Sequence, residues 1–125
     1  MKLCTAQDRV LFLEKEIDIL LNLIKLPNSN DYSLELQKNL SSILSELFRL
    51  KCAIDKTKSI VKFDEKTSMK EAELFLEQLE VRSVVMKTLS ISDTKLYNQS
   101  LDVRKLIEEI SGRLKLTSFT QDLVE

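Results

Sequence analysis

The chain has 125 residues, 31% of them charged and 43% apolar, and its 19 basic and 20 acidic side chains leave a net charge of −1. A net charge this close to zero gives no overall attraction to nucleic acid or to an anionic membrane, and the apolar fraction is too high for a disordered chain. One glycine and one proline supply too few tight turns for a many-stranded sheet, so the composition predicts an all-α fold in a single domain, residues 1–125.

The first helix is predicted over residues 6–26. Thr5, followed by Asp8 three residues later, has the spacing of an N-terminal capping box, and Pro27 ends the helix. Large aliphatic residues make the last two turns apolar nearly all round, so we expect them to be covered on more than one side. Apolar residues in steps of three and four form the first-helix seam, which consists of Val10, Leu13, Ile17, Leu20 and Ile24.

The second helix, predicted over residues 34–62, carries the strongest pattern in the chain. Its apolar residues recur in steps of four and three over nearly four heptads, which is typical of a helix that packs lengthwise against other helices. Thr57 occupies the one position of this series that is not apolar, and Cys52 beside it is predicted to be a small buried thiol. The second-helix seam consists of Leu36, Leu40, Ile43, Leu47, Leu50, Ile54 and Val61.

The third helix is predicted over residues 69–89, because Ser68 and Glu71 form a full capping box at its start. Its apolar residues spread over a wide face, so we expect this helix to contact two neighbours. The residues that widen the face are Leu74, Phe75, Val81, Val84 and Val85.

The fourth helix is predicted over residues 95–115, with Gly112 marking a frayed end or a C-cap. Residues 117–125 are polar with isolated apolar side chains, and we expect them to be loosely held. The connections between the four helices are short and polar, which favours antiparallel neighbours. The sequence therefore predicts an elongated antiparallel bundle of three to four helices with coiled-coil-like heptad packing.

Little in the sequence indicates catalysis. The absence of histidine removes the commonest general base and the commonest metal ligand, and one glycine cannot form a phosphate-binding loop. The acidic residues alternate with lysine and arginine, as on a solvated helix face. Cys4 and Cys52 have no metal-binding or redox spacing, which favours a reducing cytoplasmic location. We predict that the chain is not an enzyme and holds no cofactor or metal, and no apolar run is long enough to span a bilayer.

The leading functional hypothesis is a structural subunit of an intracellular complex. The two seams would bind other helical subunits, in a hetero-oligomer or a homo-oligomer, by burying their apolar side chains. The alternative is a self-contained bundle whose own helices fill the second-helix seam. In that case the binding surface would move to the outer faces of the first and third helices.

A second hypothesis is a self-contained regulatory bundle with a run of lysines between Lys51 and Lys70, from the C-terminal half of the second helix across the turn that follows it. Such a basic patch would bind an acidic ligand or a membrane surface. Its residues are Lys56, Lys58, Lys62 and Lys66.

The order of these segments resembles the family of the smallest shoulder subunit of dynactin. After the heptad helix, Glu73 to Glu80 open an acidic and apolar helix, residues 92–95 form a short break, and Leu101 to Ile110 form a charged helix. The resemblance covers residues 36–110. It implies a non-catalytic coiled-coil subunit of a dynein-activating, cytoskeleton-associated complex.

Overall fold

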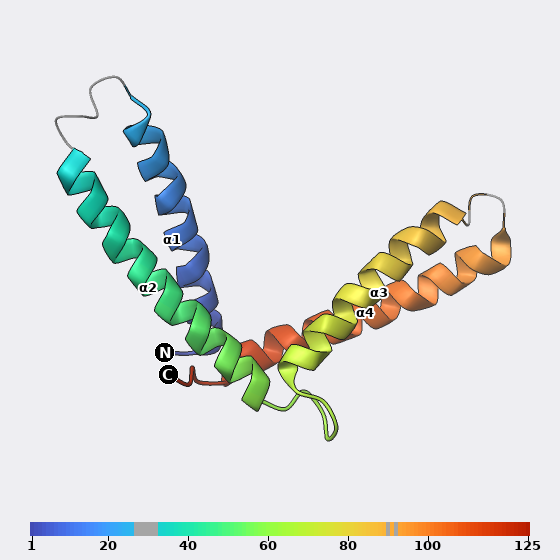
Figure 1. Ribbon diagram of the computed structural model, residues 1–125. Coiled ribbons are helices and arrows are strands. Elements are labelled where there is room, and N and C mark those ends of the chain that lie inside the picture. The colour runs from blue at the N-terminus through green and yellow to red at the C-terminus, as the bar shows by residue number, and fades with distance from the viewer. Residues whose placement is uncertain (27–32, 90, 92) are drawn as a thin grey trace. The chain divides into compact units, whose positions relative to one another are not determined.

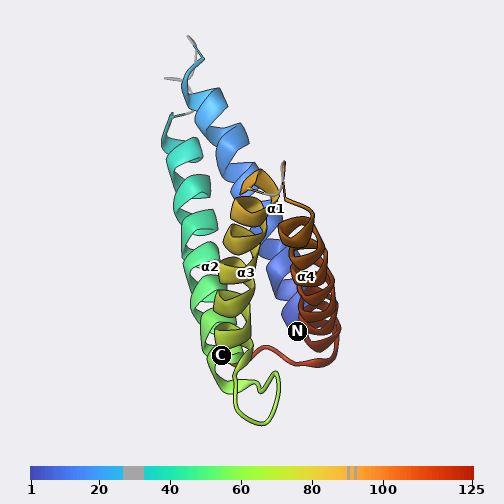
Figure 2. The same ribbon diagram turned by 90° about the vertical axis from the view of Figure 1, so that its right-hand side faces the viewer.

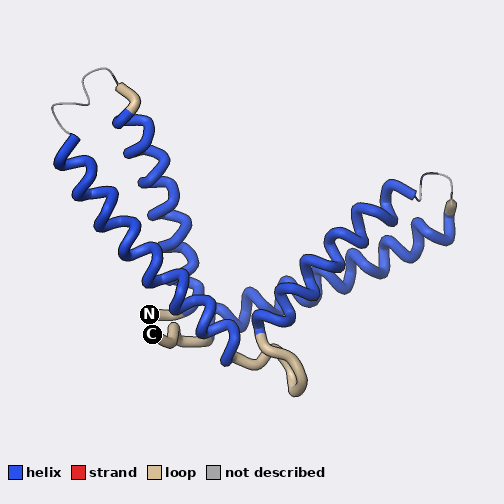
Figure 3. The backbone as a smooth tube through the Cα atoms, viewed as in Figure 1, coloured by secondary structure: helices blue, strands red, loops and turns tan. Residues whose placement is uncertain are grey.

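The computed structural model describes residues 1–26, 33–89, 91 and 93–125, and these residues form four α-helices and no β-strand (Figure 1, Figure 3). The predicted all-α class is confirmed. The helices are α1 (Leu3–Ile24), α2 (Ser33–Ile60), α3 (Met69–Leu89) and α4 (Thr94–Thr120).

The contacts between α-carbons divide the chain into two compact units. The first unit comprises residues 1–57 and 122–125, and the second comprises residues 58–121. In the first unit α1 and α2 run side by side in opposite directions, as the two views show (Figure 1, Figure 2). In the second unit α3 packs along α4. Each unit is therefore built on one antiparallel helix pair.

The core of the first unit consists of Ala6 and Leu13 from α1 with Leu47 and Leu50 from α2. Each large aliphatic side chain that is fully removed from water stabilises the fold by roughly 1.5–3 kcal/mol. Partly buried residues that pack against this core are Val10, Ile17, Ile43, Ile54 and Leu123.

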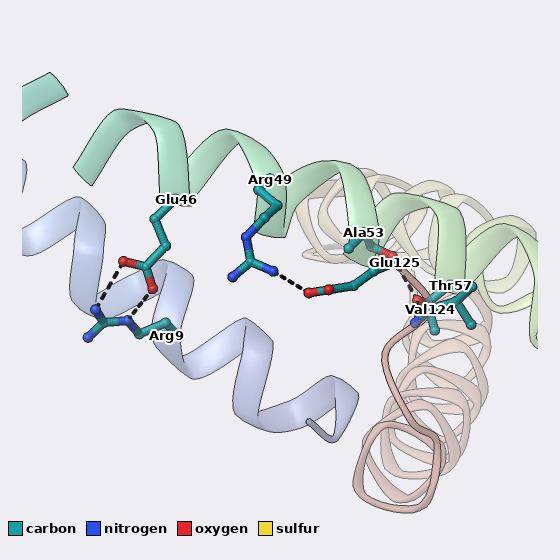
Figure 4. A network of polar contacts seen from close by, with 7 residues as sticks. All are labelled: Arg9, Glu46, Arg49, Ala53, Thr57, Val124 and Glu125. Carbon is teal, nitrogen blue, oxygen red and sulfur yellow. Dashed lines mark hydrogen bonds and ion pairs between the residues drawn. The ribbon is translucent and has the colours of Figure 1, made fainter. Parts of the chain in front are cut away.

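The last four residues are attached to the first unit, although the sequence predicts a loosely held tail. The backbone N–H of Leu123 donates to the carbonyl oxygen of Met1 at 2.8 Å, and Asp122 forms an ion pair with Lys2 at 2.9 Å. The backbone N–H of Val124 donates to the hydroxyl of Thr57 at 2.8 Å (Figure 4). Residues 122–125, which we call the C-terminal strap, are held because their apolar and polar groups both find partners.

Ion pairs link α1 and α2 outside this core. Nε and Nη2 of Arg9 contact the two carboxylate oxygens of Glu46 at 2.9 and 3.1 Å (Figure 4). The hydrogen bonds from Arg9 lower the pKa of the Glu46 carboxyl. Lys51 pairs with Glu14 at 3.3 Å. All four side chains are at least a third exposed, so these pairs contribute little to stability and mainly set the alignment of the two helices.

Small side chains are prominent among the buried residues of α3 and α4. They include Ala72 on α3 and Ser100 and Ser118 on α4, and the helix backbones approach each other closely. The hydroxyls of the two serines donate to carbonyl oxygens of their own helix, which satisfies them without a partner from α3. The large buried residues of this pair are Met69, Leu79, Ile110 and Leu114.

Local polar contacts define the ends of α3 and α4. Ser68 and Glu71 exchange hydrogen bonds of 3.2 and 3.3 Å, which confirms the predicted capping box. The loop before it is held by Asp64, whose carboxylate accepts three hydrogen bonds of 2.8 Å from Lys66 and Thr67. Asp93 caps α4 by accepting from the backbone N–H groups of its first turn.

The structure corrects several local predictions. Helix α1 begins at Leu3, with Lys2 in the capping position, so Thr5 is not the cap. Helix α4 continues through Gly112 to Thr120, because a single glycine costs a helix only about 1 kcal/mol. The second helix ends at Ile60, so Val61 of its seam lies in the following loop.

Cys52 is exposed instead of buried, since the heptad positions that face α1 lie on another side of α2. The loop at Pro27, which was predicted to end the first helix, lies outside the described residues.

Candidate interaction surface

The structure brings the central parts of the two predicted seams together inside the first unit. We expected these residues to bind another chain, and the structure packs them against each other. Toward the far end of the pair, Leu36 and Leu40 are half-buried and Ile24 is exposed. The seam residues that share one cluster are Val10, Leu13 and Ile17 with Ile43, Leu47, Leu50 and Ile54.

An open groove of about 370 Å³ follows this cluster between α1 and α2. Leu20 and Ile43, one from each seam, contribute apolar surface to it. Glu16 and Asn39 add polar groups at its edges. The central parts of the two seams are thus buried against each other, whereas Leu20 and Ile43 still contribute surface to this groove.

The outer face of α1 is apolar and exposed. Phe12, Ile19 and Leu23 are spaced by seven and four residues, which places them on one side of the helix, outside its seam, and Ile19 also borders the groove between α1 and α2. Ile19 is 59% exposed. The guanidinium carbon of Arg9 lies over the ring of Phe12, 5.2 Å from the centroid of that ring. We call Phe12, Ile19 and Leu23 the α1 outer face.

Helix α3 has a comparable surface on the side opposite α4. Leu74, Val81 and Val85 are 57%, 65% and 50% exposed and stand at helical spacing. With Gln78 between them they form one stripe, which we call the α3 outer face. This wide apolar face was predicted from the sequence, and α4 covers only the side of α3 that carries Ala72 and Leu79.

A third apolar surface on α2 is not indicated by the heptad seam. Phe48 is 72% exposed, and Leu44 lies one turn before it. Both line a shallow hollow with Leu40. Because they stand at positions i and i+4, the helical period in the sequence is the signal that could have revealed them.

The lysines of the predicted basic patch differ in their surroundings. Lys58 is 17% exposed and pairs with Glu73 at 2.6 Å. The ammonium group of Lys56 donates to the backbone oxygen of Glu125 at 3.3 Å. Lys62 and Lys66 are exposed. Carboxylate or carbonyl oxygens thus already engage two of the four charges.

The described part of the chain offers no group of three His, Cys, Asp or Glu side chains that could hold a metal ion. Within the same residues, no helix combines the length and the apolar character needed to cross a membrane. The prominent features of the described surface are therefore apolar helix faces.

No protein-family model, curated protein or solved structure matches this chain, so its own residues and geometry carry the assignment of function.

Proposed function

We propose that this chain is a non-catalytic assembly subunit that joins a larger protein complex through exposed apolar helix faces. The observation that carries the proposal is the α1 outer face. Phe12, Ile19 and Leu23 remain exposed on α1, even though α2 fills the central part of the first-helix seam. Exposed large apolar side chains gathered on one side of a helix favour a contact surface for another protein.

The partner that fits such a surface is another helix. A stripe at positions i, i+7 and i+11 accepts the apolar side of a facing helix, as in coiled coils and helical bundles. The resemblance to the small shoulder subunit of dynactin supports a cytoplasmic, cytoskeletal complex with coiled-coil chains as neighbours. Burial of a few large side chains suffices to hold such a neighbour, because each contributes roughly 1.5–3 kcal/mol.

The alternative function, binding of an acidic ligand by the lysines, has less support. The pairing of Lys58 with Glu73 removes one charge from any such surface. Lys62 and Lys66 alone make a small cationic region, and exposed charges of this kind are screened by physiological salt.

The test is co-purification of the tagged full chain from the cells that make it, followed by reconstitution with the recovered partner as a recombinant protein. We expect wild-type chain to retain a helical partner and an Ile19→Asp, Leu23→Asp variant to lose it. Asn22→Asp is the matched control, since it adds a carboxylate beside the same face without removing an apolar side chain. Circular dichroism verifies that each variant keeps its helices. Retention of the partner by the double variant, or a chain that recovers no stoichiometric partner, would contradict the proposal.

A further inference from the structure

We propose that the α3 outer face pairs in parallel with the α3 outer face of a second copy of this chain. This inference rests on the proposed function, since it names the occupant of one exposed helix face. The evidence is the arrangement of charged, amide and apolar groups along α3. This arrangement on one copy is complementary to the same arrangement on a second copy.

The apolar residues of this face follow a heptad. Leu74, Gln78, Val81 and Val85 are separated by four, three and four residues and line one shallow hollow of about 520 Å³. Leu74 and Val81 therefore occupy d positions, and Gln78 and Val85 occupy a positions. This stripe lies on the side of α3 opposite Ala72 and Leu79, which are buried. A second helix can therefore reach it without displacing α4.

The flanking charges specify a parallel partner. Glu77 precedes an a position and Arg82 follows a d position, so they occupy g and e and are five residues apart. In a parallel pair the g residue of one helix lies beside the e residue of the next heptad in the other helix. The twofold symmetry of a dimer then creates two Glu77–Arg82 pairs between the copies. Neither residue forms an ion pair with another described residue of its own chain.

The next g and e residues follow the same rule. Val84 and Leu89 are 66% and 59% exposed and again five residues apart, so the same alignment joins two apolar side chains. An antiparallel pair would bring g against g and e against e. It would leave Glu77 of one copy without Arg82 of the other. The charge pattern therefore favours the parallel arrangement.

Gln78 favours a copy of the same chain. Its amide is both a donor and an acceptor, so two Gln78 side chains facing each other at an a position can bond to each other. A polar residue at a single a position fixes register and oligomeric state, at a cost in stability. Thr88, at the following d position, already donates its hydroxyl to the carbonyl oxygen of Val84 at 2.9 Å, so its polar group is satisfied within the helix. The seam is short and contains these polar residues, so we expect an association that depends on concentration.

Sedimentation equilibrium of the full chain tests the dimer directly. We expect the average mass to rise from one chain toward two as the concentration increases up to about 1 mM. Glu77→Arg and Arg82→Glu, made separately, should each weaken association by about 10-fold or more, since each places like charges across the pair. Mixing the two variants in equal amounts should restore association, because opposite charges then meet at both flanks. Ser83→Ala, on the side of α3 away from the stripe, is the control that should associate like wild type.

Cross-linking tests the direction of the helices. In a chain with Cys4→Ser and Cys52→Ser, a Val85→Cys change should give a disulfide-linked dimer on mild oxidation, whereas Glu80→Cys, outside the stripe, should not. A wild-type chain that stays monomeric at every concentration would overturn the proposal, as would single charge variants that associate normally. If the chain does not dimerise but still binds a partner through the α1 outer face, the inference fails and the proposed function stands. Binding of a different protein by the α3 outer face of a monomeric chain would overturn the inference alone.

Discussion

The hydroxyl of Thr57 joins the C-terminal strap to α2. It accepts a hydrogen bond from the backbone N–H of Val124 at 2.8 Å and donates its own proton to the carbonyl oxygen of Ala53 at 2.7 Å (Figure 4). The side chain is fully buried. Thr57 is the one position of the second-helix seam without an apolar residue. The structure explains this exception, because an apolar side chain there would leave the N–H of Val124 without its acceptor.

Replacing Thr57 by valine should lower the free energy of unfolding by about 1–3 kcal/mol, since it keeps the shape of the side chain and removes the acceptor. Thr57→Ser retains the hydroxyl and should lose less. Urea denaturation measures the stability, and hydrogen exchange of the Val124 amide reports on the bond itself. Unchanged exchange at Val124 in the valine variant would show that the amide does not depend on Thr57.

Leu50 and Leu44 lie on the same helix, but Leu50 belongs to the second-helix seam and Leu44 lies outside it. Leu50 is 1% exposed in the core with α1, whereas Leu44 is 47% exposed. We expect Leu50→Ala to cost about 2–5 kcal/mol of stability in the isolated chain, and Leu44→Ala about 0.5 kcal/mol or less. Equal losses in urea denaturation would mean that α1 does not fill the second-helix seam in solution.

Substitutions at Gly112 test whether α4 is continuous through this position. The residue lies within the helix, and an added Cβ would meet no atom within 4 Å. Gly112→Ala should therefore raise the free energy of unfolding by about 1 kcal/mol, the difference in helix propensity between the two residues. Gly112→Pro should lower it by about 3 kcal/mol, because proline removes a helical hydrogen bond. If both changes left thermal and urea unfolding unaltered, the helix would end before this position.

The carboxylate of Asp64 should make stability depend on pH. The backbone N–H of Lys66, followed by the hydroxyl and the backbone N–H of Thr67, lowers the pKa of Asp64 below its ordinary value of 3.8. A carboxyl group with a lower pKa in the folded state stabilises the fold above its unfolded pKa, and this contribution is lost as the pH falls through the folded pKa. Acidification below 3.8 should therefore destabilise wild-type chain more than an Asp64→Asn variant.

Urea midpoints from about pH 2 to 7 measure this difference. Asp102→Asn is the control, since this exposed carboxylate of α4 accepts no hydrogen bond from another described residue and its removal changes the net charge equally. Parallel pH curves for wild type and the Asp64 variant would exclude the proposed role of the three hydrogen bonds.

The helices of this protein could be predicted where local signals define them. The bounds of α3 agree with those expected from the sequence, because the Ser68–Glu71 capping box acts between neighbours in the chain. The predicted seams also identify the sides of α1 and α2 that are buried against each other. The largest differences from the predicted bounds are at the start of α1 and the end of α4. The residue before α1 and the residues after α4 are close to each other in the fold but far apart in the chain. Their backbones are joined by the hydrogen bond from the N–H of Leu123 to the carbonyl oxygen of Met1.

The sequence by itself determined the helical class and the faces of the helices, since hydrophobic period and capping are properties of adjacent residues. Only the tertiary structure decided which faces are occupied. The heptad spacing indicates that Leu47 and Leu50 face another helix, but it does not identify the segment that provides that helix. The structure supplies it from α1, which leaves the α1 outer face exposed, and in the second unit α4 packs on the other side of α3 from the α3 outer face. The surface available to a partner therefore follows from packing between residues far apart in the chain.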